Sequence, residues 1–401
     1  MKKTTLSAVS LNITDGKHGD CVNEENSGFY FVSCKDVKDG SINYESARQI
    51  TEKDFLEANK RTLLAPNDIL ITNSGTIGRM AFIRDIPITY KTTFQKSVAI
   101  VKPNPDIIYP LYLYYQLQYC VERFINQSNG SAQKNLLLST MREFELFLHD
   151  DLKIQRRIAD ILSAYDDLIE NNRKQIKLLE EAAQRLYKEW FVDLRFPGYE
   201  HTKIVDGVPE GWEVYPFSDK IDIMSGGTPK TDNPSYYNGT IPFYTPKDSD
   251  GSFFSFKTIT NITEEGLNNC NSRLYPENTV VITARGTVGK TTLFAVPMAM
   301  NQSCYALKSD EIAAPYYLFF ALNKEIASLK AMSNGGVFNT IIVKTFDSIH
   351  ITIPSNSLIP IFETTVSPIM QQIKIKIQEN FILSEARDRL LPKLMSGEVE
   401  V

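Results

Sequence analysis

The chain has 401 residues, 42% of them apolar and 23% charged, which is the composition of an ordinary soluble protein with two or three domains. A formal net charge of −5 excludes a uniformly basic nucleic-acid-binding protein, and no run approaches the roughly 20 apolar residues of a membrane span. The five cysteines lie far apart without Cys-x-x-Cys spacing, so neither a disulfide framework nor a zinc site is indicated.

The first residues do not have the pattern of a secretory signal. Lys2 and Lys3 provide a positive start, but Ser7, Ser10 and Asn12 interrupt the apolar run that should follow. We therefore expect a cytoplasmic protein that does not enter the membrane.

Residues 1–148 are predicted to form a first mixed α+β domain. Runs of β-branched and aromatic residues, broken by Gly, Asn and Asp, predict strands at 29–33, 68–72 and 97–101. A helix is predicted from about Tyr109 to Phe124, where apolar residues recur at helical spacing. The domain holds 17 Lys and Arg against 16 Asp and Glu, so its charge is nearly balanced.

A long helix is predicted from Leu152 to Trp190, within a central spacer at 149–198. At 1.5 Å per residue it would span roughly 58 Å. Asn172 lies on its apolar seam, where a polar residue costs stability but can fix register. The other inward positions recur in steps of three and four, a heptad pattern: Ile154, Ile158, Ile161, Tyr165, Leu168, Leu179, Ala182 and Leu186.

Residues 199–355 repeat the plan as a second α+β domain. Strands are predicted at 279–283, 303–307 and 348–353, and a helix at 315–329. Between 201 and 355 the chain has 12 Lys and Arg against 15 Asp and Glu. The second domain is therefore mildly acidic.

A second long helix is predicted from Leu358 to Leu391, within a C-terminal spacer at 356–401. Pro368 is expected to bend its start, and Pro392 with Gly397 to end it. Because both seams are too apolar to remain in water, we predict that the two helices pair antiparallel. The inward positions of the second helix are Phe362, Val366, Ile369, Ile373, Ile377, Phe381 and Leu390.

Internal repetition is the most informative pattern in the chain. Pro66–Arg79 corresponds to Pro276–Lys290, and the offset is 211 at the first glycine. Two copies are too few for a solenoid, so each must bury its own core, which gives a pseudo-twofold repeat suited to a two-part ligand. Three further pairs match at offsets near 205: Ser128-Asn-Gly130 with Ser333-Asn-Gly335, Asn135 with Asn339, and Glu181–Leu186 with Glu385–Leu390.

The segment Ala284–Thr291 matches a permissive nucleotide-binding P-loop pattern. A P-loop must open a helix whose N-terminus receives phosphate, whereas residues 292–297 predict a strand ending at a proline. The first copy also lacks the Lys-Thr pair. We therefore interpret the segment as a repeated β-turn containing glycine.

Other catalytic motifs are incomplete. Asn233–Tyr236 resembles an adenine-methyltransferase motif without its second proline, and the possible nuclease fragments Pro105-Asp106 and Asp151–Lys153 are far apart. The four histidines are not at metal-ligand spacing, and no Ser or Cys lies in a nucleophile elbow. We predict a chain that is not an enzyme, with no catalytic residue and no metal ligand.

Polar loops around the repeated turns are suited to reading DNA. Arg and Lys can pair with guanine, and Asn and Gln with adenine, in the major groove. For any single residue, the alternative is a solvated loop or a turn cap. The candidate DNA-binding residues are Lys17, His18, Ser74, Arg79, Lys91, Thr93, Gln95, Lys96, Lys230, Thr231, Arg285, Thr287, Lys290, Asn301 and Gln302.

Taken together, the chain resembles the specificity (S) subunit of a type I restriction–modification system. Asp15–Gly19 and Gly226–Lys230, the latter followed by Asn233–Gly239, resemble openings of target-recognition domains. The repeated turn segments resemble the middle of those domains. The spacers are represented by Gln155–Leu162, Lys188–Gly198, Pro209–Trp212 and Leu391–Gly397.

The resemblance implies two target-recognition domains that each read one half of a bipartite double-stranded DNA target, with the helices setting the gap. It implies as partners two methyltransferase (M) subunits and restriction (R) subunits. This chain would bind no cofactor, and S-adenosylmethionine, ATP and Mg²⁺ would belong to the partner subunits.

Two other functional classes remain as alternatives. One is a structural adaptor that carries two protein-binding modules on a helical ruler. The other is a nucleotide-dependent enzyme, which depends only on the P-loop pattern. DNA titration in the presence of a methyltransferase partner separates DNA recognition from an adaptor role.

Overall fold

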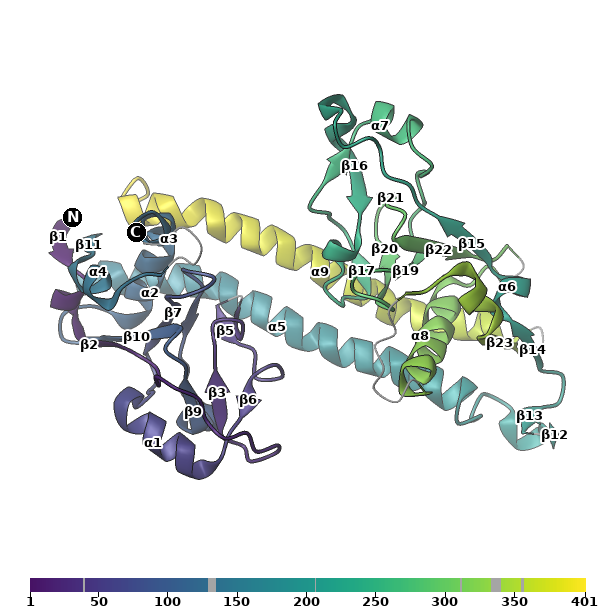
Figure 1. Cartoon of the computed structure of the whole chain (residues 1–401), viewed down its shortest axis with the longest axis horizontal. Helices are drawn as coiled ribbons and strands as arrows, with labels where there is room; N and C mark the ends of the chain where they lie inside the picture. The colour runs from purple at the N-terminus through teal and green to yellow at the C-terminus, as the bar shows by residue number, and fades with distance from the viewer. Residues whose placement is uncertain (39, 129–134, 206, 311, 333–339, 355–356) are drawn as a thin grey trace. The chain divides into compact units, whose positions relative to one another are not determined.

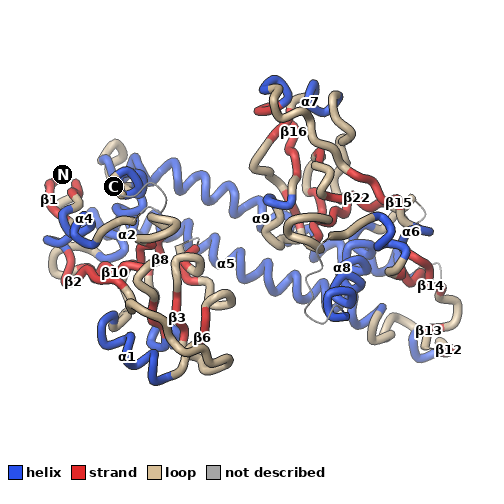
Figure 2. The backbone as a smooth tube through the Cα atoms, in the orientation of Figure 1, coloured by secondary structure: helices blue, strands red, loops and turns tan. Residues whose placement is uncertain are grey.

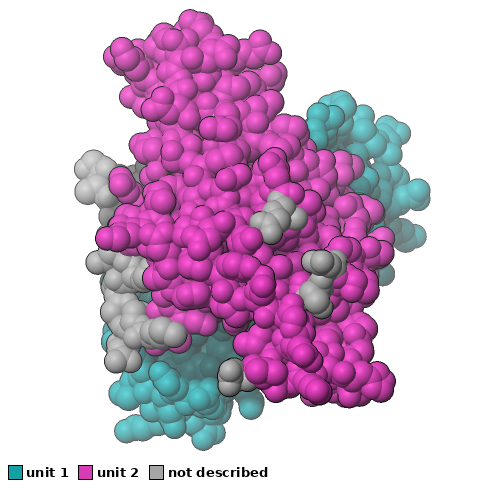
Figure 3. Space-filling model, turned by 90° about the vertical axis from the view of Figure 1, so that its right-hand side faces the viewer, with its two compact units in different colours: residues 1–168, 383–401 teal, residues 169–382 magenta. Residues whose placement is uncertain are grey.

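The computed structural model describes residues 1–38, 40–128, 135–205, 207–310, 312–332, 340–354 and 357–401. The chain forms two compact units: residues 1–168 with 383–401 make unit 1, and residues 169–382 make unit 2 (Figure 3). The repeated Asn129-Gly130 and Ser333-Asn334-Gly335, and Asn339, lie outside the described residues.

Unit 1 is built on an antiparallel sheet in the order β2-β10-β7-β8 (Figure 1). The side chains of β7 are buried on both faces, Ile69 and Ile71 in one core and Leu70 in another. Because both faces are covered, the strand is a continuous apolar run rather than an alternating one. The strands are β2 (Ser10–Asp15), β7 (Ile69–Thr72), β8 (Met80–Phe82) and β10 (Val98–Pro103).

Smaller sheets and helices complete unit 1 (Figure 2). The helix predicted at 109–124 is divided at Cys120 into α2 and α3. The smaller sheets are β1 (Lys2–Thr5) with β11 (Glu145–Leu148), β6 (Arg48–Gln49) with β3 (Tyr30–Val32) and β9 (Thr92–Phe94), and β4 (Val37–Lys38) with β5 (Ser41–Ile42). The helices are α1 (Glu52–Thr62), α2 (Pro110–Tyr119), α3 (Val121–Asn126) and α4 (Leu138–Glu143), with short 3-10 helices η1 (Ser7–Val9) and η2 (Pro87–Lys91).

Unit 2 repeats this topology. Its main sheet has the order β15-β22-β19-β20-β17, in which the first four strands correspond to β2, β10, β7 and β8. Its three-stranded sheet, β18-β16-β21, corresponds to β6-β3-β9 and has the same mixture of antiparallel and parallel pairs. The predicted duplication of a mixed α+β domain is therefore confirmed.

The elements of unit 2 agree with the predicted strands and helix. The strands are β12 (Ile204–Val205), β13 (Val208–Pro209), β14 (Glu213–Pro216), β15 (Asp222–Ser225), β16 (Tyr237–Tyr244), β17 (Phe254–Ser255), β18 (Asn261–Ile262), β19 (Val280–Thr283), β20 (Thr291–Phe294), β21 (Ala299–Met300), β22 (Cys304–Lys308) and β23 (His350–Ile353). The helices are α6 (Phe217–Lys220), α7 (Glu264–Asn268) and α8 (Pro315–Met332), with η3 (Tyr199–His201), η4 (Pro234–Tyr236), η5 (Pro246–Asp248) and η6 (Val343–Asp347).

Two long helices, α5 (Leu152–Phe191) and α9 (Leu358–Ser396), contribute to both units. In unit 2, Asn172 Nδ2 donates to Glu379 Oε2 at 3.2 Å, and the rings of Tyr187 and Phe362 lie 6.0 Å apart. Residue numbers therefore rise along α5 as they fall along α9. The predicted antiparallel pairing is confirmed, and Asn172 lies on the seam with 7% of its surface exposed.

The predicted seam of α5 was wrong at two positions. Leu168 is 52% exposed and Ala182 is also exposed, whereas the following residues Ile169 and Ala183 are buried. From Ile158 onward, buried and half-buried positions recur in alternating steps of four and three, and both Ile169 and Ala183 belong to this series. Adjacent apolar residues satisfy the helical period almost equally, so the pattern alone does not say which of the two is buried.

The predicted end of α9 at Pro392 was also wrong, because the helix continues to Ser396. A proline inside a helix costs about 3 kcal/mol by removing one hydrogen bond and crowding the preceding turn. The turn that follows buries Leu394 and Met395 in the core of unit 1, and each buried side chain returns about 1.5–3 kcal/mol. Gly397, with φ +80°, follows the helix as predicted.

Across the described ranges, the helices fall short of the length and apolarity needed to cross a bilayer. All five cysteines are free thiols.

Candidate functional site

Four segments of unit 1 meet at one end of its main sheet. Lys17 N donates to Phe94 O at 2.7 Å, and Asn73 N donates to Ser97 O at 3.0 Å. Gln95 N donates to the carbonyl of Val32 at 2.9 Å. We call this group of segments loop edge 1: residues 15–18, 33–36, 73–79 and 95–97.

Unit 2 has the same arrangement. Gly227 N donates to Met300 O at 3.1 Å, and Ala284 N donates to Ser303 O at 2.7 Å. Asn301 N donates to Tyr244 O at 3.0 Å, so Asn301 and Gln302 occupy the places of Gln95 and Lys96, as predicted. Loop edge 2 comprises residues 225–228, 245–248, 284–290 and 301–303.

The repeated glycine turn is the central segment of each loop edge. In unit 1, Thr72 O accepts from Gly78 N at 2.9 Å, and Thr72 Oγ1 accepts from Arg79 N at 2.9 Å. Thr283 makes the same two bonds in unit 2, with Gly289 N at 2.8 Å and Lys290 N at 3.0 Å. The turn joins antiparallel neighbours, β19 and β20, so no helix opens there to receive phosphate. The β-turn interpretation is confirmed and the P-loop alternative is excluded.

A glycine also allows the first segment of each loop edge to cross the fourth. A Cβ atom on Gly16 would lie 2.1 Å from Phe94 O, and one on Gly226 would lie 2.3 Å from Met300 O. Such distances are far inside van der Waals contact, so only glycine fits there. The close crossing holds the first and fourth segments together.

The second segment of loop edge 1 is a turn held by a buried carboxylate. Asp36 is 1% exposed, and its Oδ2 accepts from Ser33 N at 2.9 Å and from Ser33 Oγ at 2.7 Å. The turn adjoins the glycine turn, because a Cβ on Gly75 would lie 3.4 Å from Cys34 Sγ. Within the Ser33–Asp36 turn, the side chain of Lys35 is exposed.

Loop edge 2 contains the same turn with different neighbours. Asp248 Oδ2 accepts from Thr245 N at 2.8 Å and from Thr245 Oγ1 at 2.7 Å, and a Cβ on Gly286 would lie 3.6 Å from Pro246. Lys247 is exposed in the place of Lys35. Neither lysine was among the predicted contacts, although Ser33-Cys-Lys-Asp36 and Thr245-Pro-Lys-Asp248 repeat at an offset of 212.

Both loop edges carry positive charge in an acidic chain. Loop edge 1 has four Lys and Arg against two Asp, and loop edge 2 has three against one. The acids are engaged locally, since Asp15 pairs with Arg61 at 2.5 Å and with His18 at 3.0 Å. Six exposed cations have no ion pair or side-chain hydrogen bond with any described residue: Lys35, Arg79, Lys96, Lys247, Arg285 and Lys290.

Some predicted contacts in unit 1 have other surroundings. Lys17 pairs with Glu57 at 3.2 Å. Thr93 is fully buried, and its hydroxyl lies 3.2 Å from that of Thr62, so it is a core residue. Lys91 precedes β9 and lies over the ring of Phe29, at the end of the strand away from the glycine turn. Ser74, half-buried, and Arg79 lie on the turn itself.

In unit 2, two of the predicted residues contact other segments of loop edge 2. Gln302 Oε1 accepts from the hydroxyl of Thr228, and Thr287 Oγ1 lies 3.5 Å from Pro246 O. Burial, together with the charge of Lys290, lowers the pKa of Lys330, whose Nζ donates to Gly289 O at 2.9 Å. Two further predicted residues, Lys230 and Thr231, are exposed beyond the first segment.

The rejected motif at Asn233–Tyr236 has a structural explanation. Asn233 caps η4, since its Oδ1 accepts from Ser235 N at 3.1 Å and from Ser235 Oγ at 2.9 Å. Among the residues that the structure describes, no group of three or more His, Cys, Asp or Glu could hold a metal ion.

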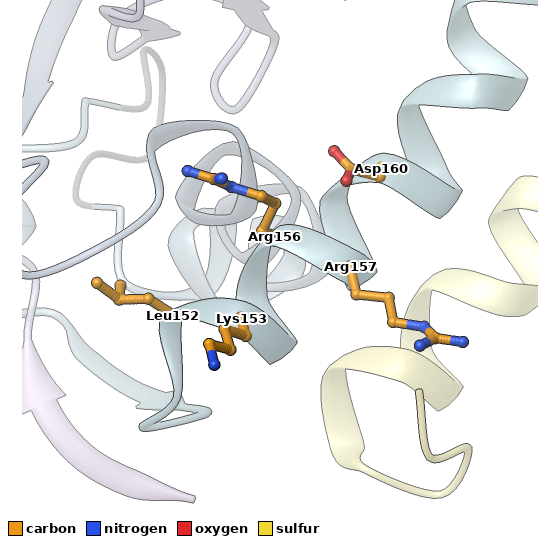
Figure 4. Close-up of a pocket in the computed structure, with 5 residues that line it drawn as sticks. All are labelled: Leu152, Lys153, Arg156, Arg157 and Asp160. Carbon is orange, nitrogen blue, oxygen red and sulfur yellow. The ribbon is translucent and has the colours of Figure 1, made fainter.

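A second, shallow surface lies at the start of α5 in unit 1 (Figure 4). Its volume is about 450 Å³, and three of its five residues are cations. Arg156 lies over the ring of Tyr109 at 5.2 Å, whereas Arg157 extends toward α9. The hollow is therefore suited to an acidic partner surface. It is lined by Leu152, Lys153, Arg156, Arg157 and Asp160.

Comparison with known proteins shows to which family the two repeated units are similar. A family model described as a type I restriction modification DNA specificity domain matches residues 16–181 and again residues 209–387. The type I restriction enzyme MjaIX specificity subunit of Methanocaldococcus jannaschii is 27% identical, with 92% of this chain and 87% of that one covered. The HindI specificity subunit of Haemophilus influenzae is 26% identical, with 75% and 80% covered. A crystal structure of a type I restriction-modification S subunit from M. genitalium has the same fold, with a TM-score of 0.59 at 16% identity over 98% of this chain and 95% of that one.

Proposed function

This chain belongs to the type I restriction–modification DNA specificity family, and we propose that each of its units reads one half of a bipartite DNA target. The observation that carries the proposal is the pair of equivalent loop edges. Each brings a glycine turn to one end of a sheet, together with exposed cations that have no ion pair among the described residues, although the chain is acidic overall. Cations that form no internal ion pair are available to phosphates and to base edges.

The two loop edges share a backbone but differ in side chains. Ser74 corresponds to Arg285, and Lys96 corresponds to Gln302. Arginine pairs with guanine and glutamine with adenine, whereas serine is permissive. A constant scaffold with different side chains is what two readers of unlike half-sites require.

We further propose that the long helices set the gap between the half-sites and dock two methyltransferase subunits. The cationic hollow at the start of α5 supports docking of an acidic partner surface. The start of α9, Leu358-Ile-Pro-Ile, lacks a counterpart of Gln155-Arg-Arg, so we expect the two docking surfaces to differ.

We propose that this chain itself is not catalytic. Methyl transfer with S-adenosylmethionine would belong to the methyltransferase subunits. ATP- and Mg²⁺-dependent cleavage would belong to restriction subunits. The role of this chain would then be to bring those activities to one DNA sequence.

Titration of the chain with its methyltransferase subunits against double-stranded DNA tests the proposal. We expect tight binding to a duplex that carries the methylated target and much weaker binding to a scrambled duplex of equal length. An adaptor of two proteins would assemble the same complex without any sequence preference. That result would contradict the proposed function.

A further inference from the structure

We infer that Lys35 and Lys247 form a matched pair of phosphate contacts, one in each half-site, that bind DNA without reading its sequence. The inference rests on the proposed function and adds a division of labour within each loop edge. It concerns the turns Ser33–Asp36 and Thr245–Asp248, which lie beside the glycine turns.

Both turns hold their lysine in a fixed place. A carboxylate accepts the backbone N–H and the hydroxyl of the first turn residue, at 2.7–2.9 Å in both units. Each carboxylate has a further donor, Ser46 Oγ at 2.9 Å for Asp36 and Ile259 N at 2.6 Å for Asp248. Both carboxylates thus hold their turns through hydrogen bonds, and within the described residues neither forms an ion pair with the lysine beside it.

The side chains of Lys35 and Lys247 are exposed and make no ion pair or hydrogen bond within the described part of the chain. Many other surface lysines are paired, as Lys3 is with Glu145 at 2.7 Å and Lys174 with Glu170 at 2.7 Å. An ammonium group fixed at its base and free at its tip suits a phosphate oxygen.

Because the same residue, lysine, occurs at this place in both units, a phosphate contact is favoured over a base contact. Lys35 and Lys247 are the same residue at the same place, whereas neighbouring positions differ: Ser74 against Arg285, and Lys96 against Gln302. Residues that read unlike half-sites are expected to differ wherever the bases differ. The sugar–phosphate backbone is the same in both half-sites and is met by constant residues, which fix the position of the protein but carry no sequence information.

The test uses the full chain in complex with its methyltransferase subunits, and two duplexes, one with the methylated target and one scrambled. We expect Lys35→Ala and Lys247→Ala each to weaken binding to both duplexes about three- to tenfold. The slope of log affinity against log salt should fall by about 0.9 for each lost contact. Lys35→Arg should restore binding, because it keeps the charge.

Exposed lysines outside the loop edges provide matched controls: Lys2→Ala in unit 1 and Lys203→Ala in unit 2 should leave affinity unchanged. Unchanged affinity in both test variants would overturn the inference, as would altered preference at one base position or failure to assemble with the methyltransferase subunits. A wild-type complex without sequence preference would instead overturn the proposed function, and this inference with it.

Discussion

Arg285 occupies in loop edge 2 the position that Ser74 occupies in loop edge 1. It lies two residues after the buried strand β19, and it is exposed and unpaired among the described residues. Its guanidinium is therefore available for a bidentate contact with a base edge. Lys290, at the other end of the same turn, has a point charge better suited to phosphate.

We expect Arg285→Ala to cost about 1–3 kcal/mol of DNA binding and to relax specificity at one position of one half-site. Lys290→Ala should weaken all sequences alike, and Gln302→Ala should relax a single adenine position. Methylation profiling across randomised targets measures all three effects. Arg285→Ser, which installs the residue of the first unit, is the matched variant. If none of the variants changes affinity or preference, the turn only determines the fold.

Glu363 is a largely buried carboxylate, and we expect its ionisation to make the stability of unit 2 depend on pH. Its carboxylate accepts from Tyr316 N at 2.9 Å and from Tyr317 N at 3.2 Å, and burial raises its pKa to about 7. The folded state therefore binds a proton more readily than the unfolded state. Stability is greatest below the ordinary pKa of about 4.5 and falls as pH rises to about 7, because ionisation then opposes folding.

Glu363→Gln should remove this contribution. A rise in pKa from 4.5 to about 7 corresponds to at most about 3 kcal/mol, since one pKa unit is worth about 1.4 kcal/mol. We expect the wild-type protein to lose more melting temperature than the variant between pH 4.5 and 7.5. Parallel pH profiles for the two proteins would contradict this assignment. Burial also raises the pKa of Glu180 to about 7, so Glu180 should contribute some pH dependence of stability in both proteins.

Among the elements, α5 provides a direct test of the spacer proposal. Inserting four residues near Gln175 adds about 6 Å and keeps the seam nearly in phase. Since a base pair spans about 3.4 Å, the preferred gap between half-sites should lengthen by one or two base pairs. Methylation profiling on targets with graded gaps gives the measurement.

A second variant has seven residues inserted into α5 near Gln175 and seven into α9 near Ile375. It keeps the heptad pattern in full and adds about 10 Å, or about three base pairs. An active variant that still prefers the original gap would refute the spacer role of the helices.

The same elements show how far sequence reasoning reaches. Long periodic segments and buried strands were predicted within a few residues, because their apolar periods extend over many positions. Leu168 and Ile169 could not be distinguished, since both are apolar and adjacent, and only the folded structure shows that Ile169 is the buried one. Likewise Pro392 was predicted to end α9, because the burial of Leu394 and Met395 in unit 1 is a tertiary effect.

The candidate site was predicted in part. The glycine turns and the match of Gln95 with Asn301 follow from repetition alone. Thr93 was misplaced because strand alternation does not reveal that both faces are covered. Lys35 and Lys247 were not predicted, because their four-residue repeat shares only Lys and Asp and is too short to be noticed without the turn geometry.

At the scale of the whole molecule, the repeat predicts that the two specificities are separable. Exchanging residues 1–148 for the corresponding residues of another family member should change one half of the methylated target and leave the other intact. The scaffold bonds around Thr72 and Thr283 are the same in both units, so each loop edge should tolerate foreign side chains. Sequencing of methylated sites reports both halves at once. A change in both halves, or in neither, would contradict independent reading.

The assignment of residues 383–401 to unit 1 has a consequence for how the chain is made. Unit 2, residues 169–382, is continuous, whereas unit 1 needs Leu394 and Met395 to complete a core that begins at Leu6. During synthesis from the N-terminus, the unit that starts first therefore finishes last. A chain stopped at Ile382 would contain every residue of unit 2 but leave unit 1 with an open core. The last turns of α9 are therefore needed to complete the unit with which the chain begins, and we expect a chain that stops before them to leave that unit incompletely folded.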